Sequence, residues 1–150
     1  MSCITLRFLA EPGSIPVGGK VRGGTVMKWI DEAGYACATR WAQRACVTVS
    51  MGSVRFQRAL LSGDLVEVEA RLAYTGQTRM NIWVEVRSGD LKTGPMPVVT
   101  ECLMVFVALD ADDTALPAPV WQPETPGDIA LAQQVKHHLD AARSGQLYNA

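Results

Sequence analysis

The chain of 150 residues lacks a long hydrophobic run and has little excess of charge of either sign. Its apolar runs are too short to cross a bilayer, and the N-terminus does not show the basic and then apolar pattern of a secretion signal. The formal net charge is −1, which excludes nucleic-acid binding by bulk electrostatics. We therefore expect a cytoplasmic protein with no membrane span and no nucleic-acid partner.

Metal-binding motifs are also missing. The two histidines, His137 and His138, are adjacent, and adjacent side chains on a helix point in different directions. The four cysteines are widely spaced and form no CxxC pair: Cys3, Cys37, Cys46 and Cys102. We expect reduced cysteines, no metal and no cofactor. A nucleophilic pair of Cys37 with a histidine would require the C-terminal tail to fold over the long helix described next.

One stretch dominates what is present. The apolar residues between positions 23 and 43 recur at intervals of three and four, which predicts a helix from Gly23 to Gln43 with one apolar stripe. The stripe consists of Val26, Ile30, Ala33, Gly34, Cys37 and Trp41. Asp31 lies at the edge of this stripe and should be half-buried. Glu32 lies on the far face, one turn after Lys28, as a solvated ion-pair partner.

The rest of the chain alternates with period two, as strands do. The predicted strands are residues 3–9, 45–51, 54–56, 65–74, 80–87 and 98–109, with a bend at Gly52-Ser53 between the second and third. In the strand 65–74, one face should carry Val66, Val68, Ala70, Leu72 and Tyr74. Short turns between these strands favour an antiparallel meander. The order predicts an α+β fold in which one curled antiparallel sheet wraps one long central helix.

The domain boundary is expected near residue 112. Hydrophobic residues make up 48% of the chain, enough for one packed domain over residues 1–112. Residues 113–150 should form a proline-rich linker and an accessory C-terminal helix. This helix should start at Thr125-Pro126 and stop at Ser144-Gly145. Its weak apolar stripe would consist of Ile129, Ala132, Val135 and Leu139.

The run from Gly23 to Gly34, with Arg40 after it, resembles the acyl-CoA thioesterases of the hotdog fold. The group containing the YciA-type bacterial enzymes and the eukaryotic cytosolic acyl-CoA hydrolases is the most similar. Phe56 followed by Gly63-Asp64, and the run from Tyr74 to Met80, are also similar to that family. The resemblance implies dimers, commonly trimers of dimers, that hydrolyse an acyl-CoA to a free acid and coenzyme A.

The resemblance also implies roles for particular residues. The backbone N–H groups of Gly23 and Gly24, at the helix N-terminus, would form an oxyanion site for the thioester carbonyl. Asp31 would act as general base or as nucleophile. In this family the acid of one subunit works opposite the helix N-terminus of the other, so the site needs a dimer.

Coenzyme A carries three phosphates, so cationic side chains should gather near the cleft. The expected substrate-binding residues are Arg22, Arg55, Phe56, Arg58, Thr78 and Arg79. Many relatives have an asparagine before the two glycines, where Pro16 stands in this chain, so activity would rest on Asp31. Two other hypotheses stay open. One is a non-catalytic acyl-CoA-binding or regulatory protein, and the other is a lyase, which usually needs a histidine near the helix start.

Overall fold

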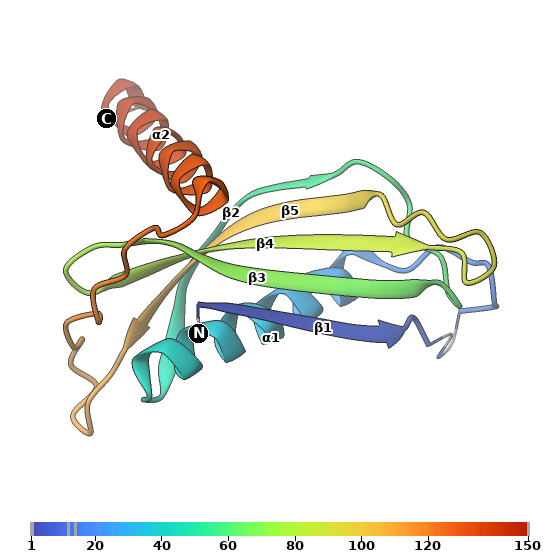
Figure 1. The fold of residues 1–150 in the computed structure, drawn as a ribbon, viewed down its shortest axis with the longest axis horizontal. Coiled ribbons are helices and arrows are strands. Elements are labelled where there is room, and N and C mark those ends of the chain that lie inside the picture. The colour runs from blue at the N-terminus through green and yellow to red at the C-terminus, as the bar shows by residue number, and fades with distance from the viewer. Residues whose placement is uncertain (1, 12, 14, 150) are drawn as a thin grey trace.

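The structure is a computed structural model that describes residues 2–11, 13 and 15–149. It contains one five-stranded sheet and two helices (Figure 1). In chain order these are β1 (Cys3–Leu9), α1 (Gly23–Ala42), β2 (Cys46–Phe56), β3 (Leu65–Thr75), β4 (Arg79–Gly89), β5 (Val98–Ala108) and α2 (Pro126–Asn149).

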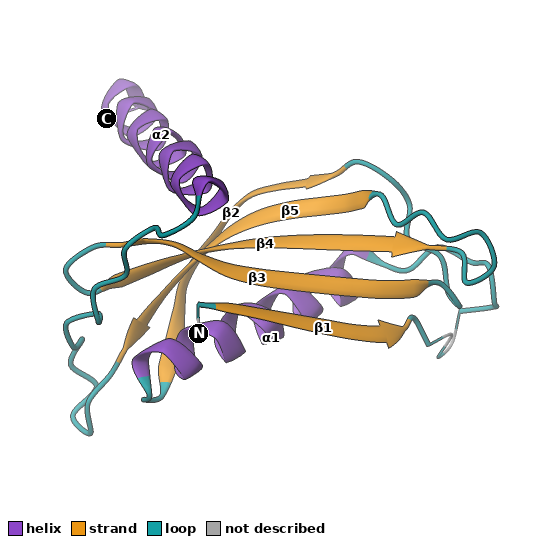
Figure 2. Cartoon of the chain, viewed as in Figure 1, coloured by secondary structure: helices purple, strands orange, loops and turns teal. Residues whose placement is uncertain are grey.

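The sheet is antiparallel throughout, with the strand order β1-β3-β4-β5-β2. It curls around α1, and α2 lies on the opposite face (Figure 2). The predicted α+β fold, with one long helix wrapped by one curled sheet and an accessory C-terminal helix, is confirmed. Strands β1 and β2 form the two edges of the sheet.

The α1 stripe packs on the concave face because its residues are apolar and small. Val26, Ile30, Ala33 and Cys37 are at most 1% exposed. Gly34 allows the closest approach, since a Cβ there would lie only 2.8 Å from Cε2 of Phe106 on β5. The small-residue face therefore sets how near the helix lies to the sheet.

Two strand predictions were wrong, both because of β-bulges. The expected break at Gly52-Ser53 does not exist: β2 runs continuously to Phe56 and absorbs the irregularity in register shifts between Thr48 and Ser50 and between Gly52 and Arg55. A further shift lies between Leu72 and Tyr74 in β3. It turns Tyr74 outward to 37% exposure, although strict alternation placed it on the same face as Val66, Val68, Ala70 and Leu72, which are buried.

Helix α2 packs on the outer face of the sheet. Thr125 caps it, since Thr125 Oγ1 accepts a hydrogen bond of 3.0 Å from the N–H of Asp128. The contact is a small cluster of Ala73, Trp83, Leu103, Leu131 and Val135. Of the four residues in the predicted apolar stripe of this helix, only Val135 belongs to the buried cluster, so that prediction was partly wrong.

Two details of α2 differ from expectation. Ile129 is 44% exposed, and Leu131 takes its place in the contact. The helix also continues through Ser144-Gly145, because one glycine weakens a helix without ending it.

The segment between β5 and α2 closes one end of the core. Trp41 at the end of α1 donates an indole hydrogen bond of 2.9 Å to the carbonyl of Pro119. The N–H of Trp121 bonds Thr75 Oγ1 at 3.1 Å, and the Trp121 ring is buried. Within the described chain, neither helix combines the length and hydrophobicity needed to cross a membrane.

Candidate functional site

Asp31 lies in the second half of α1 and is half-buried, as predicted from its place at the edge of the stripe. Thr48 on β2 donates a hydrogen bond of 2.8 Å from Oγ1 to Asp31 Oδ1. Glu32 is different, since its carboxylate is 4.0 Å from Lys28 Nζ and both side chains are largely exposed. The two neighbouring acids therefore have the separate environments that the periodicity predicted.

Sequence reasoning missed Thr48. Its strand returns along α1 only because of the tight connection after the helix, where Gln43 adopts a left-handed conformation with φ 58°. The register shift directly after Thr48 is a bulge, a feature that can re-aim a side chain. The one signal in the sequence was a threonine near the start of the strand that follows the helix. That signal alone does not indicate that the threonine binds Asp31.

The start of α1 leaves backbone N–H groups open. Arg22 is the N-cap in an extended conformation, and among the described residues no side chain caps the helix. The N–H groups of Thr25 and Val26 turn back to the carbonyl of Arg22, at 3.1 Å and 3.3 Å. Those of Gly23 and Gly24 come before the first intrahelical bond. The first turn also contains no acidic residue, so its partial positive charge is not offset.

A cleft of about 460 Å³ opens at this helix start. It is lined by Lys20, Val21, Gly23, Val26, Phe56, Gln57, Arg58, Ala59 and Leu60. The half-exposed ring of Phe56 forms one wall, close enough that a Cβ on Gly23 would lie 3.4 Å from Phe56 Cζ. Apolar side chains therefore line most of the cleft, together with two exposed cations, Lys20 and Arg58.

The structure brings some of the predicted substrate-binding residues together and separates others. Phe56 and Arg58 line the cleft, and Arg22 directly precedes Gly23. Arg55 instead lines a separate pocket beneath α2. Thr78 and Arg79 lie where the chain turns from β3 into β4, at the opposite end of the sheet from the start of α1 (Figure 1).

Asp31 and the helix start do not meet within one subunit. Gly24 and Asp31 are seven residues apart on one helix, which corresponds to about 10 Å along the axis. Strand β2, which lies beside Asp31, is the last strand in the order of the sheet. Its outer edge therefore has no neighbouring strand within the described chain. Val47 and Val49 on β2 are exposed, and so are Met27 and Tyr35, which lie one turn before and one turn after Asp31 on α1.

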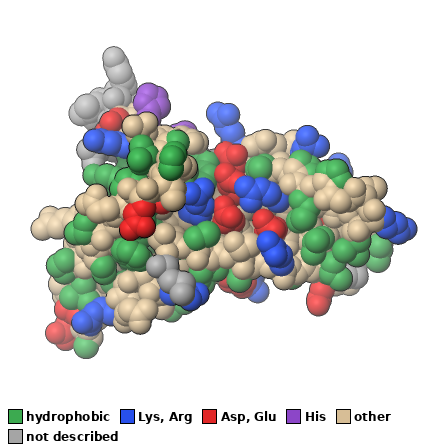
Figure 3. All heavy atoms as spheres, viewed as in Figure 1, with side chains coloured by type: hydrophobic (Ala, Val, Ile, Leu, Met, Phe, Trp, Pro, Cys, Tyr) green, Lys and Arg blue, Asp and Glu red, His purple; other side chains and the backbone are tan. Residues whose placement is uncertain are grey.

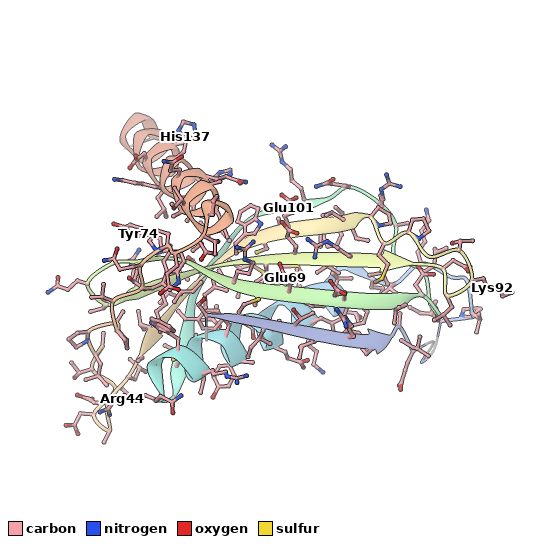
Figure 4. The ribbon with its side chains drawn as sticks, viewed as in Figure 1. Arg44, Glu69, Tyr74, Lys92, Glu101 and His137 are labelled. Atoms are coloured by element: carbon pink, nitrogen blue, oxygen red, sulfur yellow. The ribbon has the colours of Figure 1, made fainter. Side chains whose placement is uncertain are left out.

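The opposite face of the sheet carries a network of charges. Acidic and basic side chains alternate over its centre (Figure 3), and Figure 4 shows Glu69 and Glu101 there. Glu67 accepts from Arg7 at 2.8 Å and lies 3.5 Å from Arg87. In the part of the chain that the structure describes, no three His, Cys, Asp or Glu side chains are grouped so that they could hold a metal ion.

Comparison with known proteins identifies the family. The model of the thioesterase superfamily matches residues 18–95, which include the helix, the cleft and Thr48. The chain belongs to this superfamily. It is 32% identical over 120 residues to the acyl-CoA thioester hydrolase YciA of Salmonella typhimurium, an alignment that covers 78% of this chain and 90% of that protein.

Solved structures agree with the fold. The chain superposes on a hexameric acyl-CoA thioesterase with a TM-score of 0.89 at 29% identity, covering 96% of this chain and 92% of the other. It also matches a hexameric broad-specificity acyl-coenzyme A thioesterase, solved as an Asp-to-Ala mutant enzyme, with a TM-score of 0.70 at 26% identity. That match covers 87% of this chain and 94% of the other. The hotdog fold implied by the resemblance is confirmed.

Proposed function

We propose that the chain is an acyl-CoA thioester hydrolase in which Asp31 of one subunit acts opposite the α1 start of another. The observation that carries the proposal is the pairing of a half-buried, hydrogen-bonded Asp31 with a helix start that is uncapped and opens into a cleft. The relatives named as acyl-CoA thioester hydrolases support the substrate class.

The chemistry follows from these groups. The thioester carbonyl oxygen would accept hydrogen bonds from the N–H groups of Gly23 and Gly24, which stabilise the negative charge that develops there. Asp31 would take a proton from water as the water oxygen attacks the carbonyl carbon. Alternatively, the Asp31 carboxylate would attack that carbon itself, and water would then hydrolyse the mixed anhydride that forms and regenerate Asp31. On both routes the C–S bond breaks and coenzyme A leaves as its thiolate. The products are a free acid and coenzyme A, and no metal or cofactor takes part.

The site requires a dimer, and we propose that two copies pair along the free edges of β2. An unpaired strand edge presents N–H and C=O groups to a second strand. The exposed Val47 and Val49 on this edge would be covered by such pairing. A trimer of dimers is the expected full assembly, which the hexameric relatives support.

The substrate contacts divide by subunit. Phe56 and Arg58 would contact the substrate in the cleft of their own subunit, with Arg22 beside them. Thr78, Arg79 and Arg55 lie away from that cleft, so they would contact a substrate bound mainly by a neighbouring subunit. We also propose a cytoplasmic location, since all four cysteines are free thiols, as is usual in a reducing compartment.

The test is release of coenzyme A from a panel of acyl-CoAs of increasing chain length, measured with a thiol reagent. We expect turnover by the wild type and a loss of at least about 100-fold in Asp31→Asn, the usual contribution of a general base. Glu32→Gln is the matched control and should keep its activity. Binding of acyl-CoA without turnover by the wild type would favour the non-catalytic binding protein instead. Full activity in Asp31→Asn would refute the role of Asp31 while leaving the enzyme class intact.

A further inference from the structure

Two cations from two paired segments of the chain line the cleft. Lys20 lies on the segment that leads into α1, and Arg58 lies on the loop after β2. Both side chains are exposed and both line the cleft that contains Gly23. Lys20 was not among the residues that the sequence predicted to bind substrate.

Backbone hydrogen bonds hold these two segments in register. Lys20 forms a β-bridge with Leu61. The N–H of Val21 bonds the carbonyl of Leu60 at 2.8 Å, and the N–H of Ser62 bonds the carbonyl of Gly19 at 2.8 Å. This short ladder fixes the segment before α1 against the loop that carries Arg58. The spacing of the two cations is therefore set by the backbone, and only their side chains need to order around a ligand.

The surroundings leave the positive charge uncompensated. Among the described residues that line the cleft, none is acidic. The nearest acid along this loop, Asp64, is not among the residues that line the cleft, and its Oδ2 accepts the N–H of Leu61 at 3.1 Å. The open start of α1 adds partial positive charge to the same cleft. Two cations and an open helix start, in a cleft that no acidic residue lines among those described, favour an anionic ligand.

We propose that Lys20 and Arg58 form an anion subsite that selects the substrate by a phosphate or carboxylate group held close to the reacting thioester. The proposal rests on the proposed function, since it places the thioester carbonyl at Gly23. Two parts of a substrate could supply the anion: a phosphate of coenzyme A, or a carboxylate at the far end of the acyl group. Both chemistries suit a guanidinium paired with an ammonium.

The phosphate of coenzyme A and the carboxylate of the acyl group lie at different distances from the thioester carbonyl. The pantetheine arm places its first phosphate about a dozen bonds from the sulfur, or roughly 15 Å when extended. The carboxylate of a five-carbon diacid lies only about 5 Å from its thioester carbonyl. Both cations line the same cleft as Gly23, so a short acyl group that ends in a carboxylate reaches them within one subunit. A phosphate would reach them with the arm folded back or when the rest of the substrate is bound by another subunit.

The experiment compares four thioesters: valeryl-CoA, glutaryl-CoA, valeryl-pantetheine and glutaryl-pantetheine. Valeryl and glutaryl groups have the same number of carbons and differ in the terminal carboxylate, while pantetheine lacks the phosphates. The variants are Lys20→Gln and Arg58→Gln. Arg44→Gln is the control, because Arg44 is an exposed cation that lies far from the cleft, beyond the other end of α1 (Figure 4). Thiol release gives kcat/KM for every pair.

If the anion is a carboxylate, both variants lose about tenfold in kcat/KM on glutaryl-pantetheine and nothing on valeryl-pantetheine. If it is a phosphate, they lose about tenfold on valeryl-CoA and nothing on either pantetheine thioester. Either result supports the subsite. The proposal is overturned if both variants match Arg44→Gln on all four thioesters while the wild type turns them over. Failure of the proposed function looks different, because the wild type would then release no thiol from any of them.

Discussion

Replacing Thr48 by valine tests whether the hydrogen bond to Asp31 is functional. Valine has nearly the same shape as threonine and suits an edge strand, but it cannot donate to Asp31 Oδ1, which is 2.8 Å from Thr48 Oγ1 in the structure. A hydrogen bond to a charged group contributes about 1.5–3 kcal/mol net. Thr48 is exposed within the subunit, so the lower end of that range applies. A loss of about 1.5 kcal/mol corresponds to roughly tenfold in rate.

The assay is steady-state hydrolysis of an acyl-CoA that the wild type accepts. We expect kcat to fall about tenfold with KM little changed, because the bond orients the carboxylate and does not hold the substrate. Thr48→Ser, which keeps the hydroxyl, should recover most of the activity. Thr5→Val, an exposed threonine on the other edge strand, is the matched control. The reasoning is refuted if Thr48→Val keeps wild-type kcat, or if Thr48→Ser is as poor as Thr48→Val.

Three further predictions concern stability and reactivity. Gly34→Ala should lower the free energy of unfolding in urea by about 1–3 kcal/mol, since the new Cβ would lie 2.8 Å from the fully buried Phe106 ring; an unchanged or higher stability would contradict the packing. Burial tends to raise the pKa of Asp128, but hydrogen bonds from Arg71 and from nearby backbone and side-chain groups outweigh it and lower that pKa. The resulting stabilisation is present above about pH 4 and is lost as pH falls below it, so Asp128→Asn should flatten the acid limb of a stability-against-pH curve. Burial raises the pKa of the Cys37 thiol to about 12, so iodoacetamide at pH 8 should modify it in urea and spare it in the folded protein.

Local patterns predicted most of the fold. The helix was expected from Gly23 to Gln43 and runs from Gly23 to Ala42. Apolar residues that recur with a period of 3.6 over twenty residues fit a helix and no other secondary structure. The strands followed from alternation with period two, and their antiparallel pairing followed from the short turns between them. The different burial of Asp31 and Glu32 was also predictable, since the position of each residue relative to the apolar stripe depends on helix geometry alone.

What could not be predicted depends on contacts between distant residues. The bulge beside Tyr74 changes which side chains face the core, and nothing in the alternating pattern marks it. The partnership of Thr48 with Asp31 depends on the register in which β2 returns along α1. The proposed anion subsite depends on the ladder that pairs Lys20 with Leu61 and so brings Lys20 and Arg58, nearly forty residues apart, to the same cleft.

The central claim is that the acid and the oxyanion donors of one site come from different subunits. It can be tested by mixing two inactive variants. Asp31→Asn removes the base. Gly24→Pro removes one N–H at a position in the first helical turn where proline is tolerated and where an added Cβ would meet nothing within 4 Å. The two chains are co-expressed with different affinity tags and purified through both.

A mixed dimer then contains one site with both defects and one site with neither. We predict that each single variant is inactive and that the mixed dimer recovers about half of the wild-type kcat, since one of its two symmetry-related sites is intact. No recovery in a mixed dimer that binds both affinity columns would contradict the account, because it would mean that Asp31 and the N–H groups of Gly23 and Gly24 act within a single subunit.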